Sequence, residues 1–320
     1  MFNQFLDRII VGDCLEVLRQ IPDDSVDACF ADPPFNLKKK YTSYDDKKAL
    51  EDYLSWCEKW LSELVRVTKP DGSIFVHNIP KWLTYFADYL NQIAVFRHWI
   101  SWDSMSVPLG KTLLPAHYGI LYYTKQSKGF KFYDVRIPHK KCRLCDGYLK
   151  DYGGKKAQMH PFGTLASDVW TDIHRIRHNK RRDEHPCQLP IHLLERIILM
   201  SSDPDDVILD PFIGTGTTAV AAKRLGRHYI GIDIDEEYAQ IAKENVAKEE
   251  PSVVDGKYVS IFLDRIMSIR EVDCVELFPE HQEEAPIVPA LLNAAQLRFY
   301  ETAVEYDASG DEEEKVAISS

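Results

Sequence analysis

The feature that most constrains the fold is a strand–helix–strand pattern over residues 206–235, which reads DVILDPFIGTGTTAVAAKRLGRHYIGIDID. Two apolar runs, each ending in an aspartate, flank a glycine loop and a segment with helical periodicity. Strands that are joined through a helix run parallel in one sheet. Because a similar alternation fills residues 8–125, we expect an α/β fold built on a parallel sheet with helices on both faces.

The spacing of apolar residues predicts the individual elements. Apolar positions three to four residues apart predict helices, and short β-branched or aromatic runs predict strands. Residues 125–184 have weak periodicity and separate two strand–helix blocks. The expected helices are 49–66, 80–93, 189–202 and 236–250, together with a helix after the glycine loop within 211–226. Residues 8–21 are expected to form a strand, a turn and a helix. The other expected strands lie within 25–35, 69–78, 96–102, 117–125, 206–210 and 228–235, and the stretch KPDG, residues 69–72, is expected to be a turn.

Charge is distributed unevenly along the chain. The net charge is −11, but residues 271–320 hold 13 acidic and two basic side chains, so the other 270 residues balance. Residues 136–183 hold 12 basic and five acidic side chains, together with four histidines. Salt confines electrostatic fields to about 8–10 Å in the cell. This basic segment therefore suits phosphate binding even on an acidic protein, and a solvated loop is the alternative.

Composition favours a cytoplasmic protein. Hydrophobic residues make up 45% of the chain and charged residues 28%, which is typical of a soluble globular protein. No apolar stretch approaches the roughly 20 residues that span a bilayer. The first residues lack the basic region and cleavage site of a signal peptide, and the seven scattered cysteines favour free thiols. We therefore expect no membrane association.

A second constraint is the run ADPPF, residues 31–35, which directly follows an apolar strand. Proline fixes φ and cannot donate a backbone hydrogen bond. Asp32 therefore leaves the strand end on a stiff turn, beside a carbonyl without a ladder partner and the aromatic ring of Phe35. An ordinary Pro-Pro turn with a solvated Asp32 is the alternative interpretation.

The glycine loop after Asp210 predicts a ligand site. Glycines let the backbone approach a ligand, and a helix N-terminus favours polar or anionic groups. The loop lacks the third glycine of the dinucleotide fingerprint and the lysine of a P-loop. At the end of the next strand, Asp233 is suited to ribose hydroxyls and Asp235 less so. A structural turn with solvated acids is the alternative.

Cys142 and Cys145 form a CxxC pair in the basic segment. Such a pair needs two further ligands to hold zinc, and several histidines and Cys187 compete for those places. Because the other two ligands stay open, we assign no metal, and Cys142 and Cys145 remain candidate ligands.

The motifs ADPPF and DPFIGTGTT resemble the [DNS]PP[YFW] catalytic motif and the FxGxG cofactor loop of S-adenosylmethionine-dependent amino-methyltransferases. The segments GDCLEVLRQIPDDSVDACFADPPF and HPCQLPIHLLERIIL are also similar to neighbouring segments of that family. The catalytic motif precedes the cofactor loop, with the basic segment between them, as in the β class of DNA amino-methyltransferases (adenine-N6/cytosine-N4). The resemblance covers residues 8–248. It implies a permuted, Rossmann-like, mostly parallel sheet with an inserted target-recognition region.

The resemblance also implies a reaction and a set of site residues. A methyl group would pass from S-adenosylmethionine to an exocyclic amino nitrogen of a base that has left the duplex. Asp32 and the Pro33 carbonyl would accept the amino hydrogens, and Phe35 would stack on the base. The implied catalytic residues are Asp32, Pro33, Pro34 and Phe35, and the implied cofactor-binding residues are Asp13, Cys14, Asp32, Pro190, Asp210, Phe212, Gly214, Gly216, Thr217 and Asp233.

Double-stranded DNA is the expected partner, and basic side chains are its expected contacts. The lysines after ADPPF are either phosphate contacts or a solvated loop, and the run HRIRHNKRRDEH, residues 174–185, is the strongest candidate. A restriction endonuclease partner and a monomeric or homodimeric state both stay open. The candidate DNA-binding residues are Lys38, Lys39, Lys40, Arg175, Arg177, Lys180, Arg181 and Arg182.

The motifs divide the chain into four expected segments. Residues 1–125 would form the catalytic half of the methyltransferase domain, 126–184 the basic target-recognition insertion and 185–250 the cofactor-binding half. Residues 251–320 would form an acidic, partly disordered C-terminal extension.

Adenine N6 is the expected target, because the DPP form is common in adenine enzymes, and cytosine N4 is the alternative. A methyltransferase of RNA or of protein glutamine is a further alternative from another substrate class. A DNA-binding module with a relic site and a nicotinamide dehydrogenase are alternatives from outside the family.

Overall fold

The computed structural model describes residues 2–37, 47–103, 115–137, 164–173 and 188–249, together with three two-residue strands between 253 and 270. The chain divides into two compact units, of which the first comprises residues 1–133 and 167–253 and the second residues 134–166 and 254–320. The target-recognition role predicted for residues 126–184 and the extension predicted for residues 251–320 stay predictions, because the division into units rests on contacts between residues and does not test function.

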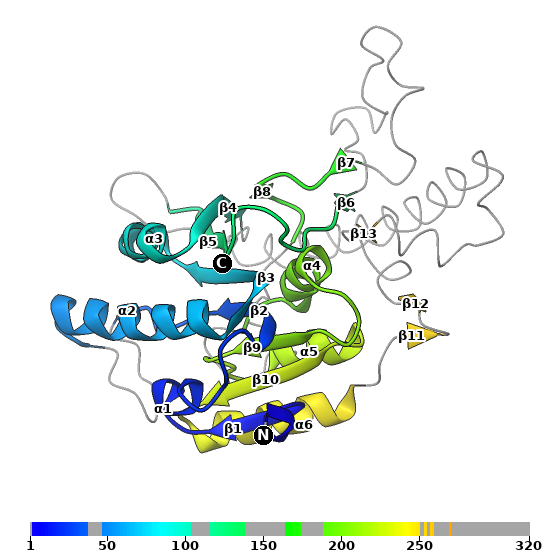
Figure 1. The fold of residues 1–320 in the computed structure, drawn as a ribbon, viewed down its shortest axis with the longest axis horizontal. Helices are drawn as coiled ribbons and strands as arrows, with labels where there is room; N and C mark the ends of the chain where they lie inside the picture. The colour runs from blue at the N-terminus through cyan, green and yellow to red at the C-terminus, as the bar shows by residue number, and fades with distance from the viewer. Residues whose placement is uncertain are drawn as a thin grey trace, which may run out of the picture. The chain divides into compact units, whose positions relative to one another are not determined.

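The first unit is built on one eight-stranded sheet (Figure 1). Its strand order is β1-β10-β9-β2-β3-β5-β4-β8. All neighbours pair parallel except that β5 runs antiparallel to both β3 and β4. The predicted mostly parallel, Rossmann-like sheet is therefore confirmed. The strands are β1 (Arg8–Val11), β2 (Val26–Ala31), β3 (Thr68–Asn78), β4 (Val95–Asp103), β5 (His117–Thr124), β8 (Val169–Trp170), β9 (Val207–Asp210) and β10 (His228–Asp233).

In the described part of the chain, three helices lie on each face of this sheet (Figure 1). The helices of one face bury aromatic and aliphatic side chains in the main core, and small alanines dominate where α5 and α6 meet the other face. A 3-10 turn (Phe2–Gln4) precedes the first strand. One face carries α1 (Cys14–Leu18), α2 (Leu50–Val67) and α3 (Pro80–Ile93), and the other carries α4 (Ile191–Ser201), α5 (Thr217–Arg224) and α6 (Glu236–Lys248).

The predicted elements and the observed ones differ mainly at two places. The stretch KPDG was expected to be a turn, but α2 ends at Val67 and β3 begins at once with Thr68. The short strand β8 lies in the segment of weak periodicity and was not predicted. It pairs with β4 through the partners Ser101↔Val169 and Trp102↔Trp170. Two residues are too few for any periodicity to show in the sequence.

The chain leaves the sheet in opposite directions after two adjacent strands. From β9 it passes through α5 to β10 on one side, and from β2 it passes through α2 to β3 on the other. The carboxyl ends of β9 and β2 therefore form a topological switch point, where open α/β sheets bind ligands.

The second unit contains a small antiparallel sheet in the order β13-β6-β7. Separately, β11 (Val253–Val254) and β12 (Lys257–Tyr258) pair with each other. The strands of the small sheet are β6 (Val135–Ile137), β7 (Thr164–Leu165) and β13 (Ile269–Arg270).

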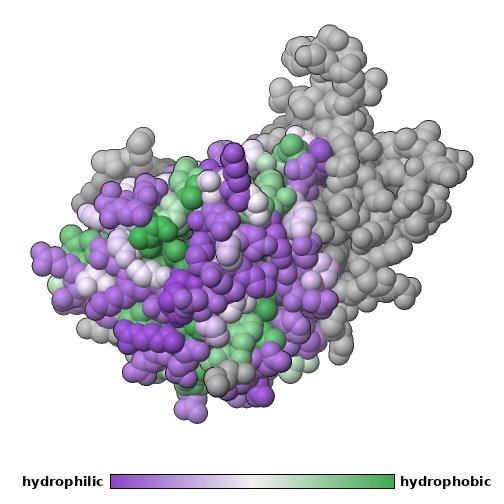
Figure 2. Space-filling view, in the orientation of Figure 1, coloured by the Kyte–Doolittle hydropathy of each residue, from purple (hydrophilic) through white to green (hydrophobic). Residues whose placement is uncertain are grey.

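Hydrophilic side chains dominate the described surface on the face shown in Figure 2, where hydrophobic ones gather only in small patches. This agrees with helices that bury their apolar sides in the core. No helix in the described ranges is long and apolar enough to cross a membrane.

A buried carboxylate ties the amino ends of three strands together. Asp27 of β2 is 1% exposed. It accepts hydrogen bonds from Lys69 Nζ at 2.8 and 2.9 Å, from Lys131 Nζ at 3.0 Å and from the Val207 amide at 2.9 Å. Burial disfavours the charged form, but the hydrogen bonds from both lysines and the amide outweigh it, so the pKa of Asp27 is lowered.

Replacing this carboxylate should destabilise the fold. Asp27→Asn should lower the free energy of unfolding by about 2–4 kcal/mol at pH 7, because two lysines lose their shared anion. The difference should shrink as the pH falls through the lowered pKa of folded Asp27. Urea unfolding monitored by circular dichroism measures both effects. The control is Asp23→Asn, whose ion pair with Arg66 has an aspartate side chain 71% exposed and should cost less than about 1 kcal/mol. Equal losses in the two variants would contradict this role.

Candidate active site

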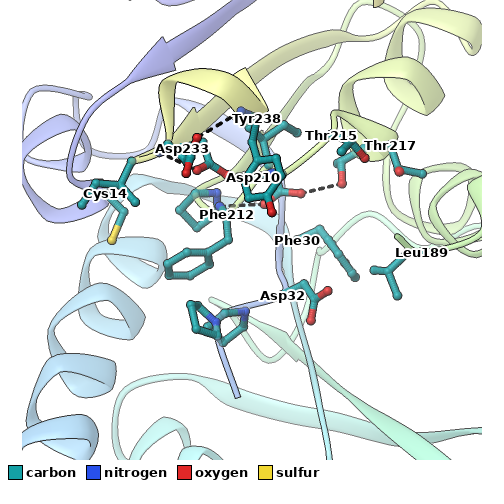
Figure 3. Close-up of a pocket in the computed structure, with 18 of the residues that line it drawn as sticks. Cys14, Phe30, Asp32, Leu189, Asp210, Phe212, Thr215, Thr217, Asp233 and Tyr238 are labelled. Carbon is teal, nitrogen blue, oxygen red and sulfur yellow. Dashed lines mark hydrogen bonds between the residues drawn. The ribbon is translucent and has the colours of Figure 1, made fainter. Parts of the chain in front are cut away.

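A cavity of about 230 Å³ lies at the switch point between β9 and β2. Its walls come from the turn after β1, the end of β2 with the ADPPF turn, the glycine loop after β9 and the end of β10 with the start of α6. Lys48, Trp56, Gln188 and Leu189 complete the lining. Figure 3 shows the side chains of Asp32, Asp210 and Asp233, which come from the ends of three strands, around one space.

The ADPPF turn is held rigid from both ends. All six residues of β2 before it are buried. On its far side, Tyr53 of α2 donates its hydroxyl to the Pro34 carbonyl at 2.6 Å. Asn36 then closes the chain against Lys48, donating from Nδ2 to the Lys48 carbonyl at 3.0 Å and accepting the Lys48 amide at 2.8 Å. No described residue donates to the Pro33 carbonyl, so that acceptor stays available at the cavity wall.

Asp32 has a partner that the sequence did not reveal. Its Oδ1 lies 2.8 Å from Nδ1 of His77, at the end of β3. The His77 side chain is 2% exposed and that of Asp32 is 16% exposed. The ring of Phe35 lies against His77, with centroids 5.9 Å apart, and is itself buried. The predicted stacking face is therefore one side of an aromatic cluster and not an isolated ring.

The two glycines of the loop after β9 are required for different reasons. Gly214 has φ +51° and donates its amide to Asp233 Oδ2 at 2.9 Å, which fixes the loop against β10. Gly216 has φ +93°, and a Cβ there would lie 2.9 Å from Ala242 of α6. Gly216 therefore serves the packing of α5 on α6, and it does not line the cavity.

The cavity is strongly acidic. Five aspartates line it, namely Asp13, Asp32, Asp210, Asp233 and Asp235, against Lys48 as the basic side chain among the described lining residues. Asp13 and Asp235 also cap the N-termini of α1 and α6. Such a wall attracts cationic groups and disfavours phosphates.

Burial changes the ionisation of several cavity groups. It raises the pKa of Asp210 to about 7, with further contributions from the charges of Asp32 and Asp233, although Thr218 Oγ1 donates to Asp210 at 2.5 Å and the Phe212 amide at 2.9 Å. Burial also raises the pKa of Asp233. It raises the pKa of Cys14 to about 12, so this lining thiol stays neutral at pH 7.

The cavity brings most of the predicted site residues together. Of the predicted cofactor-binding set, Pro190 and Gly216 do not line it; Pro190 instead precedes α4 as its N-cap. The predicted residues that line the cavity are Asp13, Cys14, Asp32, Pro33, Pro34, Phe35, Asp210, Phe212, Gly214, Thr217 and Asp233.

Two groups of predicted residues lie outside the described part of the chain. They are the DNA-binding candidates Lys38, Lys39, Lys40, Arg175, Arg177, Lys180, Arg181 and Arg182, and the metal candidates Cys142 and Cys145.

Several cavity and partner residues were missed because no motif marks them. Trp56 of α2 packs edge-on against Phe212 at 5.7 Å between centroids, and Lys48 lies over the Trp56 ring at 5.1 Å. Tyr238 lies in the first turn of α6 and lines the cavity. The helical periodicity that predicted α2 and α6 does not distinguish these residues from their neighbours, because only tertiary packing brings them to the cavity.

The chain matches known proteins in sequence and in fold. A family model described as DNA methylase (N6_N4_Mtase) matches residues 26–244. The chain belongs to this N6/N4 DNA methylase family. Two relatives are Type II methyltransferases: M.BamHI of Bacillus amyloliquefaciens is 42% identical over 277 residues, and M.HpaI of Haemophilus parainfluenzae is 36% identical over 248 residues. The matches cover 84% and 76% of this chain, but 65% and 74% of those relatives, so the chain spans slightly less than two thirds of M.BamHI.

Solved structures of DNA methylase relatives share the fold. TTHA0409 of Thermus thermophilus, in complex with S-adenosyl-L-methionine, has a TM-score of 0.53 and 25% identity, with 76% of this chain and 94% of that chain covered. The cytosine-N4-specific PvuII DNA methyltransferase has a TM-score of 0.54 at 19% identity, with 74% and 85% covered. The latter likeness is one of fold alone.

The raised pKa of Asp210 predicts a pH-dependent stability. The Asp210 carboxyl ionises near pH 4 in the unfolded chain and only near pH 7 in the folded protein. The protonated carboxyl therefore stabilises the fold at low pH, and this stabilisation is lost as the pH rises from about 4 to 7. Asp210→Asn removes this dependence. As the pH rises from 5 to 8, the free energy of unfolding of the variant should increase by on the order of 1–3 kcal/mol relative to that of the wild type. Urea unfolding across this range measures it, with the exposed Asp88→Asn as baseline. A difference between Asp210→Asn and the wild type that stays constant with pH would refute the raised pKa.

Proposed function

We propose that this chain transfers a methyl group from S-adenosylmethionine to an exocyclic amino nitrogen of a base in double-stranded DNA. One observation carries the proposal. The Asp32 carboxylate and the Pro33 carbonyl, two hydrogen-bond acceptors on consecutive residues, lie at the wall of an acidic cavity, on a turn that Tyr53 holds in place. Two rigid acceptors side by side match the two hydrogens of an amino group.

The cavity fits the proposed cofactor. S-adenosylmethionine carries a methyl group on a cationic sulfonium, together with a cationic amine. The five lining aspartates suit these charges and would repel the pyrophosphate of a dinucleotide, which disfavours a nicotinamide dehydrogenase. TTHA0409, a structural relative, has been solved with S-adenosyl-L-methionine. We assign the cofactor to Asp13, Cys14, Asp210, Phe212, Gly214, Thr217 and Asp233, and omit Pro190 and Gly216 as direct contacts.

The residues of the ADPPF turn would activate the amino group. Its lone pair is delocalised into the base, which makes the nitrogen a weak nucleophile. Asp32 and the Pro33 carbonyl would each accept one amino hydrogen and draw electron density back to the nitrogen. The nitrogen would then bond to the methyl carbon as the bond from that carbon to the sulfonium sulfur breaks, which leaves a neutral thioether. Asp32 would also take the proton that the nitrogen then loses. The base must leave the duplex to reach this wall, where Phe35 and its aromatic neighbours offer a surface for it.

The proposed target is adenine N6, with cytosine N4 as the alternative. The preference rests on the DPP sequence alone, because an amino group of either base suits Asp32 and Pro33. The fold is shared with a methyltransferase of stated cytosine-N4 specificity. Incubating genomic DNA with the protein and labelled cofactor, then mapping the modified bases by long-read sequencing, tests the activity and the base together. The absence of label in any base would overturn the proposal.

We further propose that the basic segment 136–183 contacts phosphates and selects the target sequence, and that Lys38, Lys39 and Lys40 contribute beside the turn. Support comes from charge and from position between the two motifs. Since the relatives M.BamHI and M.HpaI are named Type II methyltransferases, a companion restriction endonuclease is the proposed cellular partner.

Removing the Asp32 carboxylate should abolish the reaction and spare the cofactor. Asp32→Ala should lower the rate of methyl transfer by about 10²–10³-fold, because one preorganised acceptor is lost. Binding of S-adenosylmethionine, measured by calorimetry, should change little. The control is Asp88→Ala, an exposed residue of α3, which should keep the wild-type rate. Retention of more than a tenth of the rate by Asp32→Ala would show that Asp32 lacks this role.

A side chain at Gly214 should act on the cofactor. Gly214→Val places a β-branched residue at φ +51° in the cavity wall, where it is strained and blocks close approach of a ligand. Affinity for S-adenosylmethionine should fall at least tenfold. Gly129→Val is the matched control, because Gly129 also has a positive φ but has open space around it and lies outside the cavity. Equal affinity in both variants would place the cofactor elsewhere.

A further inference from the structure

We propose that His77 is a positioning residue for Asp32, holding one carboxylate oxygen so that the other is presented to the amino group of the base. This inference rests on the proposed function, which gives Asp32 its task. The contact itself does not depend on that function, and it can be tested separately.

The position of His77 follows from the register of two parallel strands. Ala31 of β2 is the partner of Val76 in β3. Asp32 directly follows Ala31 and His77 directly follows Val76 within β3, so the two residues are neighbours at this edge of the sheet. Nδ1 of His77 reaches Asp32 Oδ1 at 2.8 Å. Asp32 lines the cavity and His77 does not, so His77 supports the carboxylate from behind.

The surroundings of His77 determine which of its nitrogens carries the hydrogen. Nε2 is buried and has no hydrogen-bond partner among the described residues. A hydrogen on Nε2 alone would leave a buried donor unpaired and would set the Nδ1 lone pair against a carboxylate oxygen. The tautomer with the hydrogen on Nδ1 avoids both costs. His77 therefore donates from Nδ1, and Asp32 Oδ1 accepts.

Aromatic packing orients the imidazole, which makes no second hydrogen bond to any described residue. The rings of Phe35, Trp102 and Tyr118 surround it, with centroid distances of 5.9, 5.8 and 5.3 Å. Trp102 is itself anchored by donation from Nε1 to the Ile173 carbonyl at 2.8 Å. Since the only polar contact of His77 among the described residues is Asp32, the ring is arranged to serve that carboxylate.

Two substitutions separate positioning from packing. His77→Phe keeps the ring and the packing but removes the donor, whereas His77→Asn loses packing but keeps an amide donor near the place of Nδ1. We expect His77→Phe to melt close to the wild type and to lose about 10–100-fold in kcat, since small misplacements of a reacting group carry such costs. His77→Asn should melt lower but keep kcat within about threefold. KM for S-adenosylmethionine should change little in either variant.

His98→Phe makes the same change at a histidine of β4 that is 56% exposed, and it should keep the wild-type kcat. A purely structural role for His77 predicts the reverse order, with His77→Asn the less active variant, and this result would overturn the proposal.

A spectroscopic measurement tests the contact without reference to activity. In protein labelled with ¹⁵N-histidine, the ring signals of His77, assigned by their loss in His77→Asn, should show hydrogen on Nδ1 and a bare Nε2. A hydrogen on Nε2 alone would overturn the inference even if methyl transfer is normal. Failure of the wild type to methylate any DNA would instead overturn the proposed function and leave the spectroscopic result to decide on the contact.

Discussion

The parallel pairing of β2 with β9 is the constraint on which the rest of the molecule depends. It joins Ala28 to Ile208 and Cys29 to Leu209, residues about 180 positions apart in the chain. The amide of Val207 donates to Asp27 at the amino end of the same pair. This junction places the ADPPF turn beside the glycine loop at the carboxyl ends. Without it, the two motifs would lie on separate halves of the chain, and neither would enclose a cavity.

Sequence reasoning predicted the parts of the fold that local periodicity determines. The long helices α2, α3 and α6 repeat their apolar residues at helical spacing, and the strands β2 and β9 are short apolar runs bounded by turn residues. It was wrong at KPDG, which belongs to β3. Thr68 pairs with Val26 of β2 before this stretch and Ser73 pairs with Ala28 after it, and the register shifts across the residues between them. Sequence reasoning missed β8 because pairing with β4, and not composition, defines that strand.

The candidate site was predictable to the same extent. Asp32, Asp210 and Asp233 each end a predicted strand, so the shared edge of a parallel sheet brings them together. His77 lies one residue before the end of β3, but a single histidine in an apolar run carries no signal of its own. Tyr53, Trp56 and Lys48 reach the turn or the cavity from α2 and the segment before it. Their roles depend on how a helix docks on the sheet, which no local pattern encodes.

The double hydrogen bond between Asn36 and Lys48 has an evolutionary consequence. These two hydrogen bonds hold the two ends of residues 37–47 together. The conformation of the ADPPF turn therefore does not depend on how many residues lie between Asn36 and Lys48. Closing a loop of twice the length costs only about 0.6 kcal/mol more. Insertions, deletions and substitutions in this stretch should therefore have little effect on the turn. Substitutions at Asn36 or in the residues before it would disturb the turn directly. The sequence of this stretch can therefore diverge without altering the residues that line the cavity.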